Sequence, residues 1–281
     1  MYLPATLCDK RPATAGSARR TWLYFCLQVA LVVGLDIIDE VTHGLFTQTD
    51  VQVAETHALH VMEFESLHGF WVEPAIQGFF ERTHHLLGLT IGSGQADPIF
   101  DAFYGLGHVG VTLLFAIWVF LRRRALFPFL RNVFLFTNGL ALVLYRVYPL
   151  APPRLALGLR YDGRPYHFVD TVFGVGKGIK LGFDQFAAMP SLHVAWALIV
   201  GMTLAWAARP LVVRLFGLVY PLIMLTTVIV TGNHYISDAL GAVLVLIVAF
   251  TLAVVVQQWR AGEDSIWQTL QRLRRLRHAT A

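Results

Sequence analysis

The residues best suited to chemistry in this sequence are two histidines, each close to a second polar residue. The stretch TGNHYISDALGA (231–242) holds His234 and Asp238 four residues apart, so that both would lie on one face of a helix. Asp238 could then accept a hydrogen bond from one imidazole nitrogen, which fixes the tautomer and leaves the other nitrogen a better nucleophile or base. The alternative is an interfacial His–Asp pair that only satisfies its own hydrogen bonds.

The second stretch, AAMPSLHVAWA (187–197), opens an apolar helix with Pro190, Ser191 and His193. Proline suits the first turn of a helix, and the free N–H groups and positive dipole at this end attract anions. Ser191 adds a hydroxyl donor, and His193 can give or take a proton near neutral pH. A capped helix start with an interfacial histidine is the alternative interpretation.

The third stretch, YRVYPLAPPRL (145–155), places Arg146 and Arg154 on either side of a proline-rich turn. A guanidinium group binds phosphate through paired hydrogen bonds. Arg154 is the better candidate for this task, whereas Arg146 is better explained as an arginine that reaches from the helix end toward water.

These stretches belong to a chain that is too apolar for a soluble domain. Of its 281 residues, 56% are hydrophobic and 14% are charged, against about 25% charged residues in soluble domains. Six apolar runs are close to the ~20 residues that cross a bilayer, at 21–38, 102–121, 127–148, 191–207, 211–230 and 235–256. We therefore expect an all-α polytopic membrane protein, built as a bundle of six transmembrane helices.

The distribution of Lys and Arg predicts which helix ends face the cytoplasm. Fifteen of the 22 basic residues lie before the first run, between the second and third, between the fourth and fifth, and after the sixth. Because cytoplasmic segments are enriched in Lys and Arg, we expect both termini to be cytoplasmic, in the plasma (inner) membrane. All three stretches then meet at the extracytoplasmic end of the bundle.

The predicted organisation has three parts: a cytoplasmic tail (1–20), a membrane catalytic domain (21–256) and a basic amphipathic cytoplasmic tail (257–281). The last part is interpreted either as an interfacial helix or as a frayed basic segment. Within the domain, 39–101 is expected to form extracytoplasmic interfacial helices, and 149–189 an extracytoplasmic loop. That loop carries Lys177 and Lys180 on the side where basic residues are scarce, and an anionic substrate would account for them.

The order of these stretches resembles the type-2 phosphatidic acid phosphatase superfamily, whose members share Pro-Ser-x-His followed by His-x-x-x-Asp. Here the motifs are PSLH (190–193) and HYISD (234–238). FAAMPSLHVAWA and TGNHYISDALGA, with YPLAPPR upstream, are closer to the inositolphosphotransferase branch, which includes inositol phosphorylceramide synthases. The resemblance covers roughly residues 55–256.

The resemblance implies a role for each matching residue. His234 would attack phosphorus and Asp238 would orient it, while His193 would protonate the leaving oxygen and then deprotonate the acceptor. Ser191 and nearby backbone N–H groups would hold the phosphoryl oxygens, with Arg154 as a cationic clamp.

Two positions depart from the superfamily pattern. Val228 stands where an arginine usually precedes the nucleophilic histidine, and Val147 stands where a lysine usually precedes the first-motif arginine. Other cations must then contact the phosphate, and the candidates are Arg146, Lys177 and Lys180.

No metal or cofactor is expected, because histidine is the nucleophile of this mechanism and arginine supplies the positive charge. Membrane di-iron enzymes need several close histidine pairs, and the spacing of the remaining histidines does not match them. They are interpreted as interface or substrate-mouth residues: His57, His60, His68, His84, His85 and His108.

The expected enzyme is a membrane phosphotransferase or phosphatase. It would move a phosphoryl or phospho-head group from a phospholipid or polyprenyl-phosphate-type lipid to an inositol-like alcohol or to water. No nucleic-acid partner is expected, and the sequence leaves the donor, the acceptor and the oligomeric state open. Two other classes remain: an intramembrane hydrolase with Ser191 as nucleophile and His234 as base, and a non-catalytic lipid transporter that uses the site only to bind phosphate.

Overall fold

The computed structural model is a bundle of helices and describes residues 20–34, 51–81, 84–86, 89–91, 96–156, 160–161, 164–165, 186–261 and 266–276. Four helices are long and apolar enough to cross a membrane: Ile99–Arg122, α6 (Phe127–Val147), α8 (Leu211–Val230) and Ile236–Arg260. The predicted first and fourth spans are shorter apolar helices, Arg20–Gly34 and α7 (Leu192–Ala207). Four of the six predicted spans therefore reach the length of a bilayer crossing.

Two of the long helices differ from the spans predicted from the sequence. The first joins α4 (Ala96–Ala102) to α5 (His108–Arg122) through a π-helical turn, η2 (Phe103–Gly107). The last, α9 (Ile236–Ala261), continues past the predicted end of its span. Single π-helical turns inside α-helices are frequent at functional sites, because they rotate the side chains that follow.

The outer faces of the bundle expose large apolar side chains, as expected where lipid rather than water surrounds the helices. Val212 and Leu222 on α8 are 77% and 62% exposed, and Leu244 on α9 is 65% exposed. A surface of this kind is unstable in water and stable in a bilayer.

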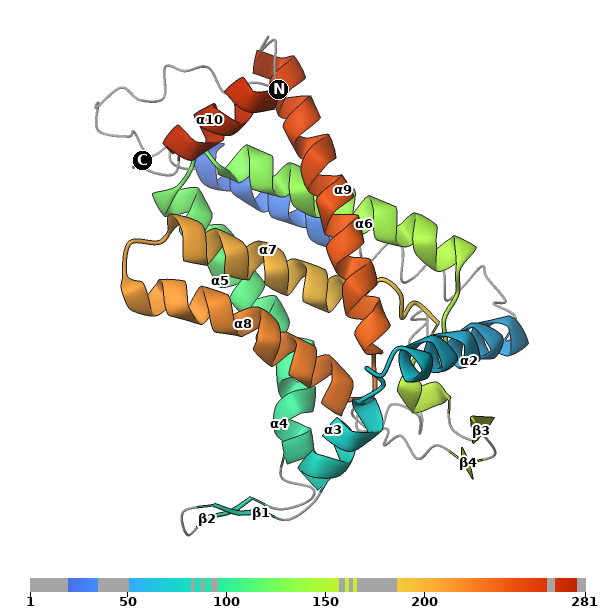
Figure 1. The fold of residues 1–281 in the computed structure, drawn as a ribbon. Coiled ribbons are helices and arrows are strands. Elements are labelled where there is room, and N and C mark those ends of the chain that lie inside the picture. Colours follow the sequence, from blue (N-terminus) through green and yellow to red (C-terminus); the bar gives the residue numbers. More distant parts are fainter. Residues whose placement is uncertain are drawn as a thin grey trace.

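The α7–α8 hairpin is the most closely packed part of the bundle, and its helices run side by side in Figure 1. Gly201 faces Gly217, and a Cβ atom built on Gly217 would lie 2.6 Å from the carbonyl oxygen of Gly201. Small residues allow helix backbones to approach each other in membranes, where apolar burial gives little driving force. Helices α6 and α9 also pack together, and they complete the core with α7.

The opposite end from the α7–α8 loop carries two helices, α2 (Val51–Leu67) and α3 (Glu73–Glu81). Met62 on α2 is buried in a second apolar cluster with Leu150 and Tyr235, whereas Leu67 is 73% exposed. The short 3₁₀ helix η3 (Pro153–Leu155) lies beside this cluster. These elements close one end of the bundle over the helix ends that carry the sequence motifs.

The all-α fold class is confirmed, and two short antiparallel ribbons accompany the helices. They pair β1 (His84–Leu86) with β2 (Leu89–Ile91), and β3 (Arg160–Tyr161) with β4 (Arg164–Pro165). Both lie in connections between helices, where backbone groups without helical partners can pair with each other.

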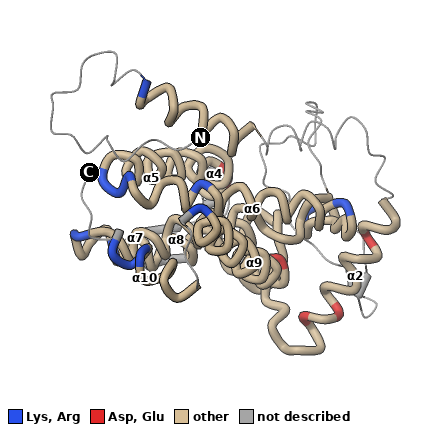
Figure 2. The backbone as a smooth tube through the Cα atoms, turned by 90° about the horizontal axis from the view of Figure 1, so that it is seen from above, with Lys and Arg blue, Asp and Glu red and all other residues tan. Residues whose placement is uncertain are grey.

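Charge is distributed unevenly along the bundle. Figure 2 shows most of the described Lys and Arg residues at the end where α5 finishes and α10 (Ile266–Leu276) lies, and acidic residues along α2 at the other end. On α10, Leu273 is buried against the bundle while Arg274 and Arg275 are exposed. The C-terminal basic segment is therefore helical and packed over the described part, rather than frayed.

Candidate active site

Three chain segments that are far apart in the sequence meet at the end covered by α2 and α3. The backbone N–H of Arg154 donates to the carbonyl oxygen of Gly232 (2.8 Å), and that of Ser191 donates to the carbonyl oxygen of Asp238 (3.1 Å). Leu150 also forms an isolated parallel bridge with Ala187. Backbone hydrogen bonds thus join the end of α6, the start of α7 and the α8–α9 turn.

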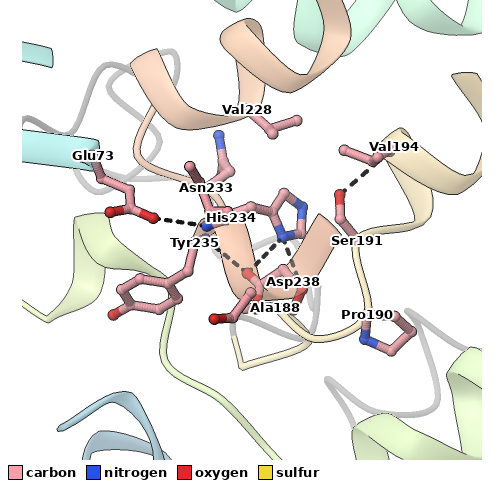
Figure 3. A network of polar contacts seen from close by, with 12 residues as sticks. Glu73, Ala188, Pro190, Ser191, Val194, Val228, Asn233, His234, Tyr235 and Asp238 are labelled. Carbon is pink, nitrogen blue, oxygen red and sulfur yellow. Dashed lines mark hydrogen bonds and ion pairs between the residues drawn. The ribbon is translucent and has the colours of Figure 1, made fainter. Parts of the chain in front are cut away.

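His234 lies in the turn between α8 and α9 and is held through its Nδ1 atom, as Figure 3 shows. Nδ1 lies 2.8 Å from the carbonyl oxygen of Ala188 and 3.2 Å from Oδ2 of Asp238. A carbonyl oxygen can only accept, so Nδ1 carries the proton in the neutral ring, and the lone pair lies on Nε2. The residue is 5% exposed. The geometry therefore leaves the lone pair of Nε2 outside these hydrogen bonds.

Asp238 reaches His234 by a different route from the one the spacing suggested. Helix α9 begins at Ile236, so His234 precedes the helix and the two residues do not share a helical face. Instead, Oδ2 of the fully buried Asp238 also accepts a hydrogen bond from the backbone N–H of Tyr235 (2.9 Å). This is half of a capping box, in which the third residue of a helix binds the N–H of the capping residue. One carboxylate oxygen therefore caps α9 and orients His234.

Ser191 is the N-cap of α7. Its backbone is extended, and its buried hydroxyl accepts a hydrogen bond from the N–H of Val194 (3.4 Å). The expectation that Pro190 sits in the first helical turn is wrong, because the helix starts at Leu192, after the cap. The carbonyl oxygen of Pro190 instead accepts a hydrogen bond from the hydroxyl of Tyr145 (2.8 Å), which ties the motif to α6.

His193 follows in the first turn of α7 and faces His234, with 6.0 Å between ring centroids. Its ring stacks on Tyr104 at 4.1 Å, and that of His108 lies 5.0 Å away. Tyr104 lies in the π-helical turn η2, and His108 follows directly after it. His108 is buried and contacts the hydroxyl of Tyr220 through Nδ1 (2.8 Å), so it is a packed neighbour of His193 rather than a residue at a substrate mouth.

Arg154 lies on η3 beside the same turn. Its Nε atom donates to the side-chain oxygen of Asn233 (2.9 Å), and the amide of Asn233 donates to the hydroxyl of Thr231 (2.9 Å). Since Asn233 directly precedes His234, the guanidinium group is anchored one residue away from the imidazole. Asn233 is a site residue that the sequence reasoning missed, and its position next to His234 was the available signal.

The other predicted phosphate ligands are less well placed or lie outside the described residues. Arg146 is exposed in the last turn of α6. Lys177 and Lys180 lie outside the described residues. Val228, at the position of the missing superfamily arginine, is buried, and its carbonyl oxygen accepts from the N–H groups of Asn233 (3.0 Å) and His234 (3.2 Å).

Three polar residues on α2 and α3 bind the turn and were not anticipated. Oε1 of Glu73 accepts from the N–H of Ile236 (2.7 Å), and Oε1 of Glu65 accepts from the N–H of Ser237 (2.7 Å). Burial, together with the charge of Glu73, raises the pKa of Glu65 to about 8, and burial also raises the pKa of Glu73. Gln77 donates to carbonyl oxygens at the end of α8. The sequence around Glu65 and Glu73 gives no sign that either carboxyl group binds this turn.

The remaining histidines are spread over the end of the bundle. His57 contacts the carbonyl oxygen of Pro149 through Nδ1 (2.7 Å) and stacks on Tyr148, while His60 and His68 are exposed on α2 and just after it. His84 and His85 form part of β1. Within the described ranges, no three His, Cys, Asp or Glu side chains are grouped as a metal site would require.

Comparison with known proteins gives one match. The sequence profile of the PAP2 superfamily matches residues 59–252, which include the second half of α2, all of α3 to α8 and most of α9. No curated protein and no solved structure matches the chain. The matched range contains every element that forms the site described above and spans more than half of the sequence, so this chain belongs to the PAP2 superfamily.

Proposed function

We propose that this protein is a membrane phosphotransferase or phosphatase that acts on a lipid-linked phosphate or phosphodiester through a phosphohistidine intermediate. Membership of the PAP2 superfamily indicates phosphatase or phosphotransferase chemistry on lipid phosphates. The observation that carries the proposal is the state of His234: its Nδ1 is bound by a carbonyl oxygen and a carboxylate, so Nε2 is free to attack.

In the first step, Nε2 of His234 attacks phosphorus, and the bond from phosphorus to the leaving oxygen breaks. His193 donates its proton to that oxygen, so the leaving group departs as a neutral alcohol. Asp238 stabilises the positive charge that develops on the imidazole of His234. Attacking and leaving atoms lie on opposite sides of phosphorus in such a transfer, which agrees with two separate imidazoles whose ring centroids lie 6.0 Å apart.

In the second step, water or an alcohol attacks phosphorus, and the bond from phosphorus to Nε2 breaks. His193, now neutral, takes the proton of the attacking oxygen and is ready for the next cycle. The acceptor therefore decides between phosphatase and transferase activity, while the histidines perform the same tasks in both.

Phosphoryl oxygens would be held at the N-terminus of α7 and by Arg154. The N-terminal N–H groups of a helix and a fixed guanidinium group both stabilise negative charge on oxygen. Ser191 caps that helix, and Asn233 anchors Arg154 beside His234. Arg146, Lys177 and Lys180 are proposed to supply the charge that the superfamily arginine provides elsewhere.

Within the superfamily, we assign the chain to the inositolphosphotransferase branch, on the motif residues around 145–155, 187–197 and 231–242. The donor is then a phospholipid or polyprenyl-phosphate-type lipid, and the acceptor an inositol-like alcohol. The proposed topology has six spans in the plasma (inner) membrane, both termini in the cytoplasm and the site at the extracytoplasmic end. The charge asymmetry along the bundle supports this orientation.

The serine hydrolase alternative is less well supported. A nucleophilic serine needs a hydrogen bond to its base. Among the described residues, the hydroxyl of Ser191 accepts from the N–H of Val194 and forms no hydrogen bond with His234. A non-catalytic lipid transporter would have no need of a histidine with a fixed tautomer.

The test uses purified protein in detergent with ³²P-labelled phosphatidic acid and with a nitrophenyl phosphodiester. We expect turnover and an acid-labile, base-stable phosphoryl group on His234. Comparing the lipids of membranes with and without the protein would identify the head group that is transferred. Absence of turnover with any lipid phosphate would favour the transporter, and complete loss of activity in Ser191→Ala without phosphohistidine in the wild type would favour the hydrolase.

A further inference from the structure

The turn that carries His234 lies between two helix ends of opposite polarity. Helix α8 ends at Val230, so its last carbonyl oxygens lack helical partners, and α9 starts at Ile236, so its first N–H groups lack them too. The carbonyl end carries a partial negative charge, and the N–H end a partial positive one. Both ends are buried, and each needs a partner of the matching kind.

One face of α3 provides a partner for each end. Glu73 and Gln77 are four residues apart, one helical turn along the same face. The side-chain amide of Gln77 donates to the carbonyl oxygens of Ile229 (3.2 Å) and Val230 (3.1 Å). The carboxyl group of Glu73 accepts from the N–H of Ile236 (2.7 Å). The donor therefore meets the negative end of α8, and the acceptor meets the positive end of α9.

Helix α2 adds a third contact. Glu65 is buried and accepts from the N–H of Ser237 at 2.7 Å, next to the N–H that Glu73 binds. Asp238 follows and binds Tyr235 and His234. Side chains of α2 and α3 thus bind the first two N–H groups of α9, and Asp238, the third residue of α9, binds His234. Figure 3 shows Glu73, Asp238 and His234 grouped around this turn.

We propose that Glu65, Glu73 and Gln77 are positioning residues that clamp the α8–α9 turn at both of its ends and so set the position of Nε2 of His234 relative to phosphorus. The proposal rests on the proposed function, since it assigns His234 as the nucleophile. The three side chains contact backbone groups of the turn and act through it. Their effect on chemistry follows from alignment, because a displacement of about 1 Å at a reacting atom can cost about 100-fold in rate.

Two measurements on each variant test the clamp in the full-length protein. The first is hydrogen exchange of the backbone amides in 229–238, read by mass spectrometry. The second is the single-turnover rate at which a nitrophenyl phosphodiester phosphorylates His234, with the donor concentration varied to separate binding from rate. Glu63→Ala is the matched control, because Glu63 lies on α2 near Glu65 but is exposed.

For Glu73→Ala we expect faster exchange in 229–238 and a phosphorylation rate about 10–100-fold lower, with donor affinity unchanged. Glu73→Gln should recover most of the rate, because the amide oxygen still accepts from Ile236. Gln77→Glu should be more damaging than Gln77→Met, since its carboxylate would face carbonyl oxygens. Glu63→Ala should change neither measurement.

Faster exchange without loss of rate in Glu73→Ala and Gln77→Met would overturn the proposal, because the residues would then only stabilise the fold. If Glu73→Ala does not fold, Gln77→Met, which keeps the side-chain volume, decides in its place. A wild type that never forms phosphohistidine would refute the proposed function instead. The exchange measurement would still show whether the clamp holds the turn, and unchanged exchange in both variants would refute it.

Discussion

The Nδ1 atom of His234 lies closer to the carbonyl oxygen of Ala188 (2.8 Å) than to the carboxylate of Asp238 (3.2 Å). Ala188 belongs to the segment that leads into α7, two residues before Pro190 of the Pro-Ser-x-His motif. The orientation of the histidine is therefore shared between the backbone of one motif and the aspartate of the other. Since a carbonyl oxygen cannot donate, it keeps the proton on Nδ1 even without the carboxylate.

This sharing predicts a moderate effect of Asp238→Asn. In serine proteases the corresponding change reduces kcat about 10⁴-fold, because the histidine adopts the wrong tautomer. Here Ala188 preserves the tautomer, so we expect a clearly smaller loss, on the order of 10–100-fold, from weaker stabilisation of the charged imidazole. Asp238→Ala should lose more, because it also removes the cap of Tyr235. Single-turnover phosphorylation of His234 measures both, and equal losses would contradict the argument.

A donor with an activated leaving group should distinguish the role of His193 from that of His234. A nitrophenyl leaving group needs no proton, so His193→Ala should still release nitrophenol, whereas a lipid donor should react about 10²–10⁴-fold more slowly. His234→Ala should be inactive with both donors, because no nucleophile remains. Nitrophenol release is followed by absorbance. Equal residual rates in the two variants would show that the roles are assigned wrongly.

Stability should fall with rising pH because of Glu65. Its pKa is raised to about 8 by burial and by Glu73. Between its ordinary pKa of 4.5 and about 8, the folded protein keeps a proton that the unfolded chain has lost, so folding weakens as pH rises through this window. The slope is at most about 1.4 kcal/mol per pH unit for one proton. Groups that face Glu65 are Glu73 on α3, Tyr235 in the turn and Ser237 on α9.

Thermal unfolding in detergent from pH 5 to pH 9 measures this dependence. Glu65→Gln cannot titrate and should flatten the curve over that window, while Glu63→Ala should reproduce the wild-type slope. A wild-type curve that rises between pH 5 and pH 8, or an unaltered slope in Glu65→Gln, would contradict the assignment.

The α7–α8 contact predicts a stability effect of adding one methyl group. The Cβ of Gly217→Ala would lie 2.6 Å from the carbonyl oxygen of Gly201 and 2.8 Å from the backbone nitrogen of Ala205, so the helices must separate. Overpacking of this kind costs about 1–3 kcal/mol. Gly139→Ala on α6 is the control, because nothing lies within 4 Å of its added methyl. Thermal unfolding should separate the two variants, and equal stability would argue against the close approach.

The proposed topology can be tested with single cysteines in a background in which Cys8 and Cys26 are replaced by serine. Glu63 on α2 and Arg209 in the α7–α8 connection are both exposed, and they lie toward opposite ends of the bundle. An impermeant thiol reagent added to intact cells should label Glu63→Cys and leave Arg209→Cys unlabelled until the cells are opened. The reverse pattern would invert the orientation.

The sequence alone determined the class of the molecule and the identity of its motifs. Apolar runs of near-bilayer length can only be satisfied as helices, because lipid offers no partners for backbone groups. Hydropathy therefore located the helices Ile99–Arg122, α6, α8 and Ile236–Arg260, whereas the other two predicted spans are shorter helices in the structure. The PSLH and HYISD motifs led to the PAP2 superfamily, which the profile match over 59–252 confirms.

Local spacing was a poorer guide to how the motif residues touch. The interval between His234 and Asp238 suggested a shared helical face, whereas the structure joins them through a capping box at the start of α9. Pro190 was expected inside α7 and precedes its cap. Helix boundaries depend on which side chains cap the ends, and single-residue shifts there change the geometry of every contact.

The surroundings of His234 depend on tertiary contacts. Ala188 contacts His234, Tyr104 stacks on His193, and Glu73 binds the N–H of Ile236. These residues come from three different segments, and none carries a sequence pattern that predicts its contact. Their positions follow from how helices pack and from which buried backbone groups need partners, and both depend on residues far away in the chain. Composition and motifs thus indicate which side chains are available for chemistry, and helix packing determines how those side chains are oriented.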